Sequence, residues 1–374
     1  MWLFFFLIIY IYIMSIVLYK NKVGEQRGVC DRCIIFLLST MGLLLLLTCL
    51  RSLSTGNDTW SYYELFKYYT TGATMREYSE EGYYWMDSYV DIGWRFLSKA
   101  IGGVSYSYQL FISVIAAFFY GVTTRYLAKY SPNISASVML FFLLFFHRYL
   151  NVLRQFTSIM IVLIGFDYLQ KKQYIRFVIC VLVAMLFHKF AFVSLILILF
   201  FEISLNNFRI ISIIIFSAFM SASGGVFIIP RLIGYSGGYL SDQTGISTVF
   251  SFILNSIVFM MAEVLYPSPY FYRLQDKKIR KNLNFYRWIN LIVLCLSILE
   301  IALPGVYRVI YFFSIFQIVG IPFVMAYSDR SRYFKVRCFL IIILTIIVYQ
   351  TGILVFRPEW NTAFPYHFFW QEYA

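Results

Sequence analysis

The chain has 374 residues, of which 61% are hydrophobic, 21% aromatic and only 13% charged, and its mean hydropathy is +0.73. These values lie far outside the range of soluble globular domains, so we expect a polytopic membrane protein. The net charge of +13 would suggest a nucleic-acid partner in a soluble protein. Because basic residues of membrane proteins collect in cytoplasmic loops, we attribute the charge to membrane orientation and expect no nucleic-acid partner.

The first apolar run, Trp2 to Tyr19, predicts a retained helix rather than a cleaved signal peptide. No basic residue precedes it and no small-residue cleavage site follows it. The six cysteines lie mostly in or beside apolar segments, so no disulfide framework is visible. Cys30-Asp-Arg-Cys33 has the spacing of a zinc ligand pair, but no second such pair and no histidine pair accompany it. We therefore predict no metal site.

The apolar segments predict an all-α polytopic fold of about 12 transmembrane or re-entrant helices, within a single integral membrane domain at residues 1–374. Several segments are shorter than the roughly 20 residues that a straight crossing needs, so we expect broken or re-entrant helices among them. The segments lie at about 2–19, 34–50, 105–124, 134–146, 155–169, 175–187, 190–203, 210–222, 248–265, 288–303, 309–327 and 338–356.

Clusters of basic residues predict which loops face the cytoplasm. The strongest cluster lies in the loop 266–287, where six Lys or Arg residues occur between Arg273 and Arg287. The long interval 51–104 instead holds five basic and seven acidic residues, which favours a partly helical extracytoplasmic loop. The other predicted cytoplasmic clusters are Lys20 to Arg32, Arg125 with Lys129, Lys171 to Arg176, and Arg330 to Arg337.

The apolar stretch 177–203 lies between two loops whose predicted sides require it to leave the cytoplasmic face and return. Each arm of such a hairpin is too short to cross, which places His188 and Lys189 at its tip in the outer half of the membrane. A charged group at that depth is costly unless it lines a wet cavity, so a functional role is favoured. The alternative is one long tilted crossing with His188 hydrogen-bonded in the bundle.

Other polar residues converge on the same predicted side. His147-Arg148 and Arg154-Gln155 lie in a short outer link, and Pro304-Gly-Val-Tyr-Arg308 connects two later helices. All of these groups fall on the outer side together with Asp58 and Asp91. We therefore expect an active site that faces the periplasm or cell exterior.

Several of these fragments, in this order, resemble the EpsG family of bacterial exopolysaccharide proteins, which are Wzy-like polymerases of lipid-linked sugar repeat units. The resemblance covers nearly the whole chain. The Asp91 fragment departs from the family pattern, which usually has Glu there, and Glu81-Gly82-Tyr83 is a competing match. The matching residues are Arg51 with Gly56-Asn-Asp58-Thr and Tyr62 or Tyr63, Asp91-Ile-Gly93-Trp-Arg-Phe-Leu97, Leu153-Arg154-Gln155, Lys171-Lys172, Ala184-Met-Leu-Phe-His188-Lys, and Tyr307-Arg308-Val.

The resemblance implies transfer of a glycan from one polyprenyl diphosphate to a sugar hydroxyl of another lipid-linked unit, in the bacterial cytoplasmic membrane. A diphosphate leaving group needs fork-shaped positive donors, for which Arg is better suited than Lys. Arg154 and Arg308 are the first candidates, followed by Arg51 and Arg148. The acceptor hydroxyl needs a base, and Asp58, Asp91 and His188 stay open for that role. For sugar contacts we expect Trp60, Tyr62, Gln155 and Tyr307, and the aromatic residues Tyr63, Tyr83, Tyr84 and Trp85 are further candidates for stacking on sugar rings.

The donor is already activated, so the reaction needs no nucleotide, and the sequence has neither a Walker loop nor a dinucleotide fingerprint. We expect no cofactor and a metal-independent reaction in which arginines neutralise the diphosphate. The expected partners are polyprenyl-diphosphate-linked oligosaccharides, membrane lipid and a chain-length regulator.

Each assignment has a structural alternative. Asp58 would serve only as a helix cap, before Ser61-Tyr-Tyr-Glu64, which fits a capping box. Arg148, Arg154 and Arg308 would serve as interfacial anchors. Among functions, a flippase for lipid-linked oligosaccharides suits twelve segments, but the two halves of the chain show no repeat. An acyltransferase using His188 fits less well because its donor would come from the cytoplasm, whereas a glycan ligase shares all of the polymerase chemistry.

Overall fold

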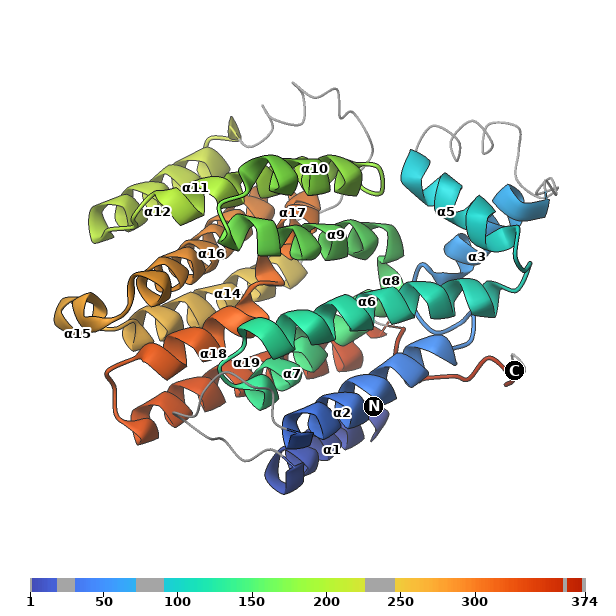
Figure 1. Ribbon diagram of the computed structural model, residues 1–374, viewed down its shortest axis with the longest axis horizontal. Coiled ribbons are helices and arrows are strands. Elements are labelled where there is room, and N and C mark those ends of the chain that lie inside the picture. The colour runs from blue at the N-terminus through green and yellow to red at the C-terminus, as the bar shows by residue number, and fades with distance from the viewer. Residues whose placement is uncertain (1, 19–30, 72–90, 226–245, 359–361, 372–374) are drawn as a thin grey trace. The chain divides into compact units, whose positions relative to one another are not determined.

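The computed structural model describes residues 2–18, 31–71, 91–225, 246–358 and 362–371, and these residues are helical with no β-strand. The chain separates into two compact units. The first unit comprises Met1–Tyr130, Val138–Phe192 and Thr351–Ala374, and the second comprises Ser131–Ser137 and Val193–Gln350. Figure 1 labels the helices of both units.

Among the described residues, six helices are long and apolar enough to cross a membrane, and a seventh crossing is counted if one bent pair is a single span. All twelve predicted apolar segments are helical, but a count of about twelve crossings is not confirmed, because hydropathy locates apolar runs without showing how far each helix continues. The bent pair is Pro304–Ser314 with Gln317–Tyr327, whose axes differ by 53°. Three apolar helices are shorter: Trp2–Leu18, Tyr174–Met185 and Asn207–Ala222. The six long helices are Asp31–Cys49, Tyr108–Tyr130, Ile134–Asn151, Thr248–Leu265, Lys277–Ala302 and Arg332–Phe356.

The first unit is built mostly from helices that pack through aromatic side chains. Around Tyr149, for example, the rings of Phe119, Phe141 and Phe156 lie 5.1, 5.0 and 4.7 Å away between centroids. Its helices are α1 (Trp2–Leu18), α2 (Asp31–Cys49), α3 (Thr59–Thr71), α5 (Ile92–Gly102), α6 (Tyr108–Tyr130), α7 (Ile134–Phe141, which begins in the second unit), the π-helix η1 (Phe142–Phe146), α8 (His147–Asn151), α9 (Leu153–Gln170) and α10 (Tyr174–Met185).

The predicted outer interval 51–104 is partly helical, as expected, because α3 and α5 lie within it. The predicted break at His188 is also present: α10 ends at Met185, and a 3₁₀-helix, η2 (Lys189–Ile196), follows. The amide of His188 still donates to the carbonyl of Ala184 at 3.1 Å, so the chain turns directly after the last helical turn. Whether this stretch forms the predicted hairpin stays a prediction.

The predicted cytoplasmic cluster of Arg125 and Lys129 lies beside the end of α9, which directly precedes the cluster Lys171 to Arg176. Asp167, near the end of α9, pairs with Arg125 and with Lys129, whose Nζ lies 2.7 Å from the carboxylate. The ends of α6 and α9 are therefore adjacent. Arg154 lies at the start of α9 and Tyr108 at the start of α6, so these residues belong to the opposite end of the same helices.

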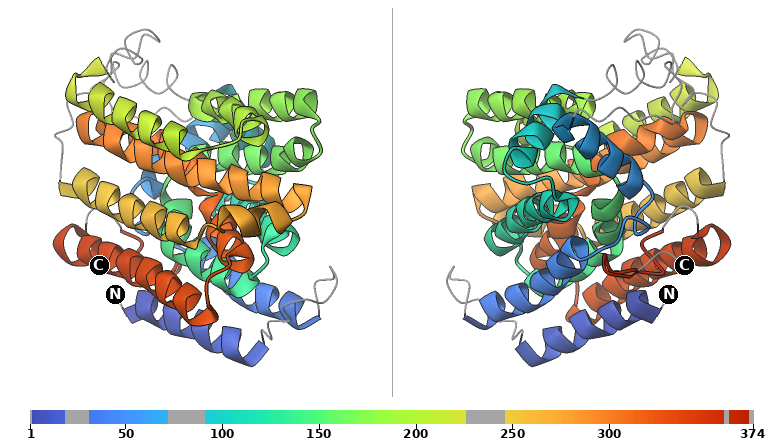
Figure 2. Two further views of the ribbon diagram at one scale, coloured as in Figure 1. Left: turned by 90° about the vertical axis from the view of Figure 1, so that its left-hand side faces the viewer. Right: turned by 90° about the vertical axis from the view of Figure 1, so that its right-hand side faces the viewer.

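The second unit places α12 and α14 on either side of α16, as both Figure 1 and Figure 2 show. The described helices of this unit are η2 in part, α11 (Leu197–Glu202), α12 (Asn207–Ala222), α14 (Ile246–Leu265), α15 (Pro269–Leu274), α16 (Lys277–Ala302), η5 (Pro304–Val306), α17 (Tyr307–Ser314), α18 (Gln317–Tyr327) and α19 (Arg332–Phe356), whose last residues belong to the first unit.

Two polar pairs join α14 to the last turns of α16. Ser251 donates to Glu300 at 2.9 Å, and Asn255 donates to Ser297 at 2.6 Å. Hydrogen bonds between membrane helices fix their relative rotation and contribute roughly 0.6 kcal/mol each. These residues are spaced four apart on α14 and lie at one end of α16, so they define which faces of the two helices meet.

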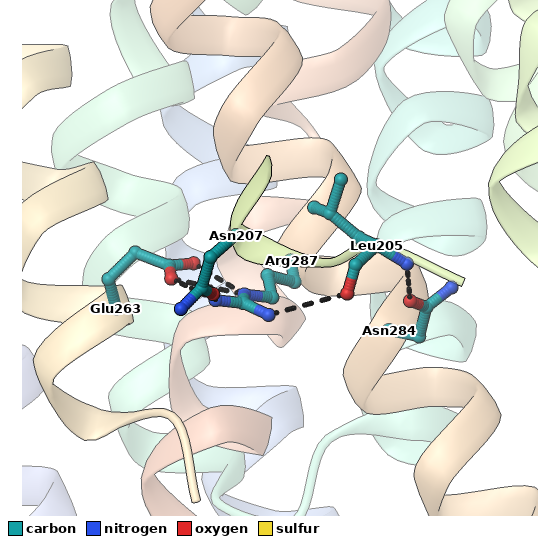
Figure 3. A network of polar contacts seen from close by, with 5 residues as sticks. All are labelled: Leu205, Asn207, Glu263, Asn284 and Arg287. Carbon is teal, nitrogen blue, oxygen red and sulfur yellow. Dashed lines mark hydrogen bonds and ion pairs between the residues drawn. The ribbon is translucent and has the colours of Figure 1, made fainter. Parts of the chain in front are cut away.

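At the other end of α16 a charged network closes the polar turn before α12 (Figure 3). Arg287 donates from Nε and Nη2 to Glu263, at 2.6–3.0 Å, and from Nη2 to Asn207 at 3.1 Å. Asn284 accepts from the amide of Leu205 at 2.7 Å. The basic residues of the predicted cytoplasmic loop 266–287 therefore begin α16 and are partly used in holding the fold.

Candidate functional site

The start of α5 is held against the end of α10 by a glycine. The amide of Gly93 donates to the carbonyl of Leu186 at 2.7 Å, and a Cβ added at Gly93 would lie only 2.7 Å from that oxygen. Only glycine permits this approach without a shift of the backbone. The contact brings Asp91, which directly precedes α5, to the region where α10 ends and Lys189 follows.

Asp91 occupies the N-cap position of α5, but its side chain makes no capping hydrogen bond. One carboxylate oxygen instead lies 3.5 Å from Nη1 of Arg154, in the first turn of α9. Their side chains are 21% and 27% exposed, so the pair is shielded but reachable. An acid at a helix N-terminus normally caps it; here the carboxylate faces a guanidinium instead.

Burial raises the pKa of the Asp91 carboxyl above its ordinary value. The charges of Arg154, Lys189 and Arg95 act in the opposite direction and hold the pKa down, but burial is the larger effect. The site thus joins one carboxylate to three cations. A carboxyl group with a raised pKa is a stronger base when ionised, which suits proton abstraction.

Two buried aromatic residues, Tyr62 and Trp94, pack beside the Asp91–Arg154 pair. Tyr62 is buried, its ring lies 5.3 Å from that of Trp94, and its hydroxyl accepts from the amide of Arg154 at 3.5 Å. Burial raises the pKa of Tyr62. The structure places Tyr62 against the first turn of α9, and its predicted role as a sugar contact stays a prediction.

The loop before α3 is fixed by a second glycine and two asparagines. Gly56 has φ +99°, and a Cβ there would lie 2.7 to 2.9 Å from Thr59, Asn151 and the carbonyl of Leu150. The amide of Asn57 donates to Oδ1 of Asn151 at 2.6 Å. The Thr-Gly-Asn turn is therefore packed tightly against the end of α8, in a conformation that allows little change.

The segment after α19 returns to this loop. Thr362 donates from its amide and hydroxyl to Oδ1 of Asn57, at 3.2 and 3.0 Å. The amide of Ser52 donates to the carbonyl of His367 at 2.8 Å, and that of Phe369 to the carbonyl of Leu50 at 2.9 Å. We call residues 362–371 the C-terminal segment; no pattern in the sequence predicted its position at the site.

Arg51 lies beneath the C-terminal segment and forms an isolated antiparallel bridge with Phe368. Its side chain is only 1% exposed. Burial lowers the pKa of its guanidinium, whereas the nearby hydroxyls of Tyr108, Tyr366 and Tyr120 raise it. The predicted diphosphate contact of Arg51 stays a prediction, and this structure shows the side chain covered.

Asp58 and Trp60 are exposed beside the loop, Trp60 by 53%. Because α3 begins at Thr59, Asp58 is at the N-cap position, and its carbonyl accepts from the amide of Tyr62 at 3.0 Å. The alternative capping box starting at Ser61 is wrong, since Ser61 lies inside the helix. The position of Asp58 is compatible with capping and with catalysis.

Three further candidates line neighbouring elements of the first unit. His188 is half-buried, and its ring lies 5.5 Å from that of Phe190. Arg148 on α8 places its guanidinium 5.6 Å from the ring of Phe145. Gln155 is fully buried in the first turn of α9. Their roles as base, diphosphate ligand and sugar ligand stay predictions.

The remaining two candidates belong to the second unit. Tyr307 and Arg308 begin α17 directly after η5, which contains Pro304. Nε of Arg308 donates to the hydroxyl of Tyr307 at 3.1 Å, and the guanidinium lies 5.6 Å from the Tyr307 ring centroid. The two predicted residues therefore act as one local pair.

Within the described residues, no three His, Cys, Asp or Glu side chains are grouped so that they could hold a metal ion. Cys30, Glu81, Tyr83, Tyr84 and Trp85 lie outside the described residues, so the structure does not test their predictions. A metal-independent reaction stays a prediction.

The sequence reasoning missed several residues that build the site. Arg95 and Trp94 were quoted only as part of a motif, and neither Asn151 nor the residues of the C-terminal segment were considered. A useful signal was present in the short motif after Asp91, because α5 has apolar and polar residues on opposite faces. The contacts of the C-terminal segment had no such signal, since they depend on distant backbone groups.

The sequence model of the EpsG family matches residues 32–368, which is nearly the whole chain. No curated protein and no solved structure matches it. The match includes the loop at Arg51, Asp91, Arg154, His188, Arg308 and most of the C-terminal segment. EpsG-type proteins are Wzy-like polymerases, which indicates an exopolysaccharide polymerase type of role. This membrane-embedded chain belongs to the EpsG family.

Proposed function

We propose that the protein is a polysaccharide polymerase that moves a growing glycan from polyprenyl diphosphate to a sugar hydroxyl of another lipid-linked repeat unit. The observation that carries this proposal is the Asp91–Arg154 contact, with an N–O distance of 3.5 Å. It joins a partly buried carboxylate to a guanidinium group, which is well suited to bind a diphosphate. The two groups are what a metal-independent transfer from a diphosphate requires.

In the proposed reaction, the acceptor hydroxyl oxygen attacks the anomeric carbon of the donor glycan. The carboxylate of Asp91 takes the hydroxyl proton while the bond from the anomeric carbon to the diphosphate breaks. The polyprenyl diphosphate leaves with the electron pair, and Arg154 neutralises the charge that develops on it. Lys189 and Arg95 add to the positive field around Asp91.

The ion pair itself would respond to substrate. In the free protein the charge of Arg154 lowers the pKa of Asp91. A diphosphate bound to Arg154 would offset that charge, so the pKa of Asp91 would rise further. Asp91 would then become a stronger base only when the donor is in place.

The proposal places this chemistry on the outer face of the bacterial cytoplasmic membrane. Support comes from the first unit, where Arg125, Lys129 and Asp167 mark one end and Arg154 marks the other. The basic end is expected in the cytoplasm. Arg308 in the second unit, together with Arg51, Arg148, Asp58, His188, Trp60 and Tyr307, stays among the proposed contacts with the lipid-linked substrates.

A strain that lacks the protein distinguishes this function from two others. A polymerase deletion should accumulate single repeat units that have already reached the outer leaflet, as shown by their access to an externally added glycosidase. Units trapped on the inner leaflet would indicate a flippase, and finished chains that remain on the polyprenyl carrier would indicate a ligase. Either of these results would exclude the polymerase assignment.

A further inference from the structure

Arg51 carries a positive charge that no acid offsets in the described part of the first unit. None of its three guanidinium nitrogens has a hydrogen-bond partner in good geometry, although each is buried. The hydroxyls of Tyr108, Tyr366 and Tyr120 are the polar groups that influence it. Buried guanidinium groups normally pair with carboxylates, because an uncompensated buried charge is strongly unfavourable.

The three tyrosines supply neutral oxygens only. The hydroxyl of Tyr108 donates to the carbonyl of Thr59 at 3.1 Å, and that of Tyr366 donates to the carbonyl of Leu47. Tyr120 shares a hydrogen bond of 2.9 Å with Thr48. These hydroxyls lie near the cation and influence it electrostatically, but they do not neutralise its charge. An anion bound at Arg51 would supply the missing negative charge and would also accept from hydroxyls that rotate toward it.

The cover over Arg51 is the C-terminal segment. It is held by backbone hydrogen bonds with Ser52 and Leu50 and by the bonds between Asn57 and Thr362. The hydroxyl of Thr55 also donates to the carbonyl of His367 at 3.1 Å and accepts from the amide of His367 at 3.0 Å. All of these bonds are neutral and involve one short segment. Releasing that segment would also break the Tyr366 bond to the carbonyl of Leu47 and the ring contact of Phe364 with Phe4, but it would break no hydrogen bond within a membrane helix.

We propose that Arg51 is a covered binding site for a phosphate-type anion, and that the anion reaches it when the C-terminal segment lifts from the loop 51–58. The planar guanidinium matches the two oxygens of a phosphate group. Under the proposed function, on which this identification rests, the anion is the diphosphate of the polyprenyl-linked substrate. The C-terminal segment is then the element that admits the diphosphate and covers it.

Thermal unfolding of the purified protein tests the anion site without any measurement of elongation. Inorganic pyrophosphate and polyprenyl diphosphate, each at about a hundred times its dissociation constant, should raise the Tm of the wild type by several degrees, and polyprenyl alcohol should not. A rise with polyprenyl diphosphate alone would assign the site to the lipid-linked anion rather than to free pyrophosphate. No rise with either anion would overturn the proposal.

The variant Arg51→Met should abolish the rise. It should still fold, because replacing an uncompensated buried charge by an apolar side chain of similar length is often neutral or stabilising. Arg51→Lys should keep part of the rise, since it retains the charge but loses the fork. If the rise survives in Arg51→Met and disappears in Arg154→Ala, the covered site is wrong while the proposed function stands.

A disulfide lock tests the cover. The amide of Gly56 donates to the carbonyl of Thr362 at 3.2 Å, so the two backbones are adjacent there, and we choose the double variant Asn57→Cys/Thr362→Cys to join the loop to the C-terminal segment. The oxidised double variant should lose the pyrophosphate-induced rise, and a reductant should restore it. The two single variants, oxidised in parallel, control for the native cysteines. An undiminished rise in the locked protein would show that the segment does not need to lift.

Discussion

Asp91 precedes a helix that it does not cap, and its carboxylate faces Arg154 instead. Because burial raises its pKa, the ionised form costs the folded state free energy at neutral pH. The contribution of this group to stability is therefore greatest at low pH and declines as the pH rises through the folded pKa. A residue kept for stability alone would have the opposite sign.

Replacing Asp91 should separate activity from stability. Asp91→Asn keeps the shape but cannot accept a proton, so we expect elongation to fall by at least 10²-fold, within the usual range for loss of a general base. The Tm at pH 7 should be unchanged or higher, because the ionisation cost disappears. Glu64→Gln, on α3, is the matched control. Normal elongation by Asp91→Asn would show that Asp91 is not the base, which leaves Asp58 and His188 as the candidates.

The charges around Asp91 make a prediction about pH. Lys189 and Arg95 both lower the pKa of Asp91, so Lys189→Gln and Arg95→Gln should each raise it. The acidic limb of the elongation rate against pH should move to higher pH in both variants. Lys99→Gln, at the exposed far end of α5, should leave the limb in place. An acidic limb that disappears in His188→Gln and does not move in either of these variants would identify the histidine as the titrating group.

At this scale the sequence was informative where a motif was short and local. Asp91, Arg154 and Tyr62 were all candidates, and the structure brings them together through Gly93 and the first turn of α9. Their division of labour was not predictable. Tyr62 lies under the guanidinium rather than in the open, because burial depends on how α3, α5 and α9 pack.

The loop 51–58 is the element whose shape depends most on one residue. Gly56 has a positive φ and leaves no space for a Cβ. Gly56→Ala should therefore destabilise the protein by about 1–3 kcal/mol and lower the Tm. Gly121→Ala on α6, where a Cβ meets nothing within 4 Å, should be neutral or slightly stabilising. Equal Tm values for the two variants would contradict the tight packing of the Gly56 turn against α8.

Element positions followed from hydropathy more reliably than element lengths did. The segment at 288–303 was predicted as a short helix, but α16 extends from Lys277 to Ala302. The polar first turns of α16 are held by contacts with Glu263, Asn207 and Glu202. No local sequence pattern predicts these contacts. The opposite error occurs at 309–327, where the apolar run is continuous but the helices bend by 53°.

For the whole molecule, sidedness is the property that the sequence predicted and that an experiment can check. Lys67 on α3 and Lys171 after α9 are both exposed and lie in intervals assigned to opposite faces. In intact spheroplasts, a membrane-impermeant thiol reagent should label Lys67→Cys strongly and Lys171→Cys only after permeabilisation. Labelling of the unsubstituted protein measures the background from native cysteines. The reverse pattern would place the Asp91–Arg154 pair in the cytoplasm.

Molecular organisation was predictable only in outline. An all-helical membrane protein of the EpsG family follows from composition and ordered motifs, and the family match supports it. The division into two compact units did not follow, because it depends on packing between distant segments such as α1 and the C-terminal segment, whose Phe4 and Phe364 rings lie 5.7 Å apart.

The most direct test of polymerase function uses the purified protein in lipid with defined polyprenyl-diphosphate-linked repeat units. Without nucleotide sugar and with a chelator present, wild-type protein should convert single units into longer glycans, resolved by gel or mass spectrometry. Arg154→Ala and Asp91→Asn, purified to the same yield, should leave the units single. Chains that never lengthen with the wild type, or that lengthen equally with both variants, would contradict the account.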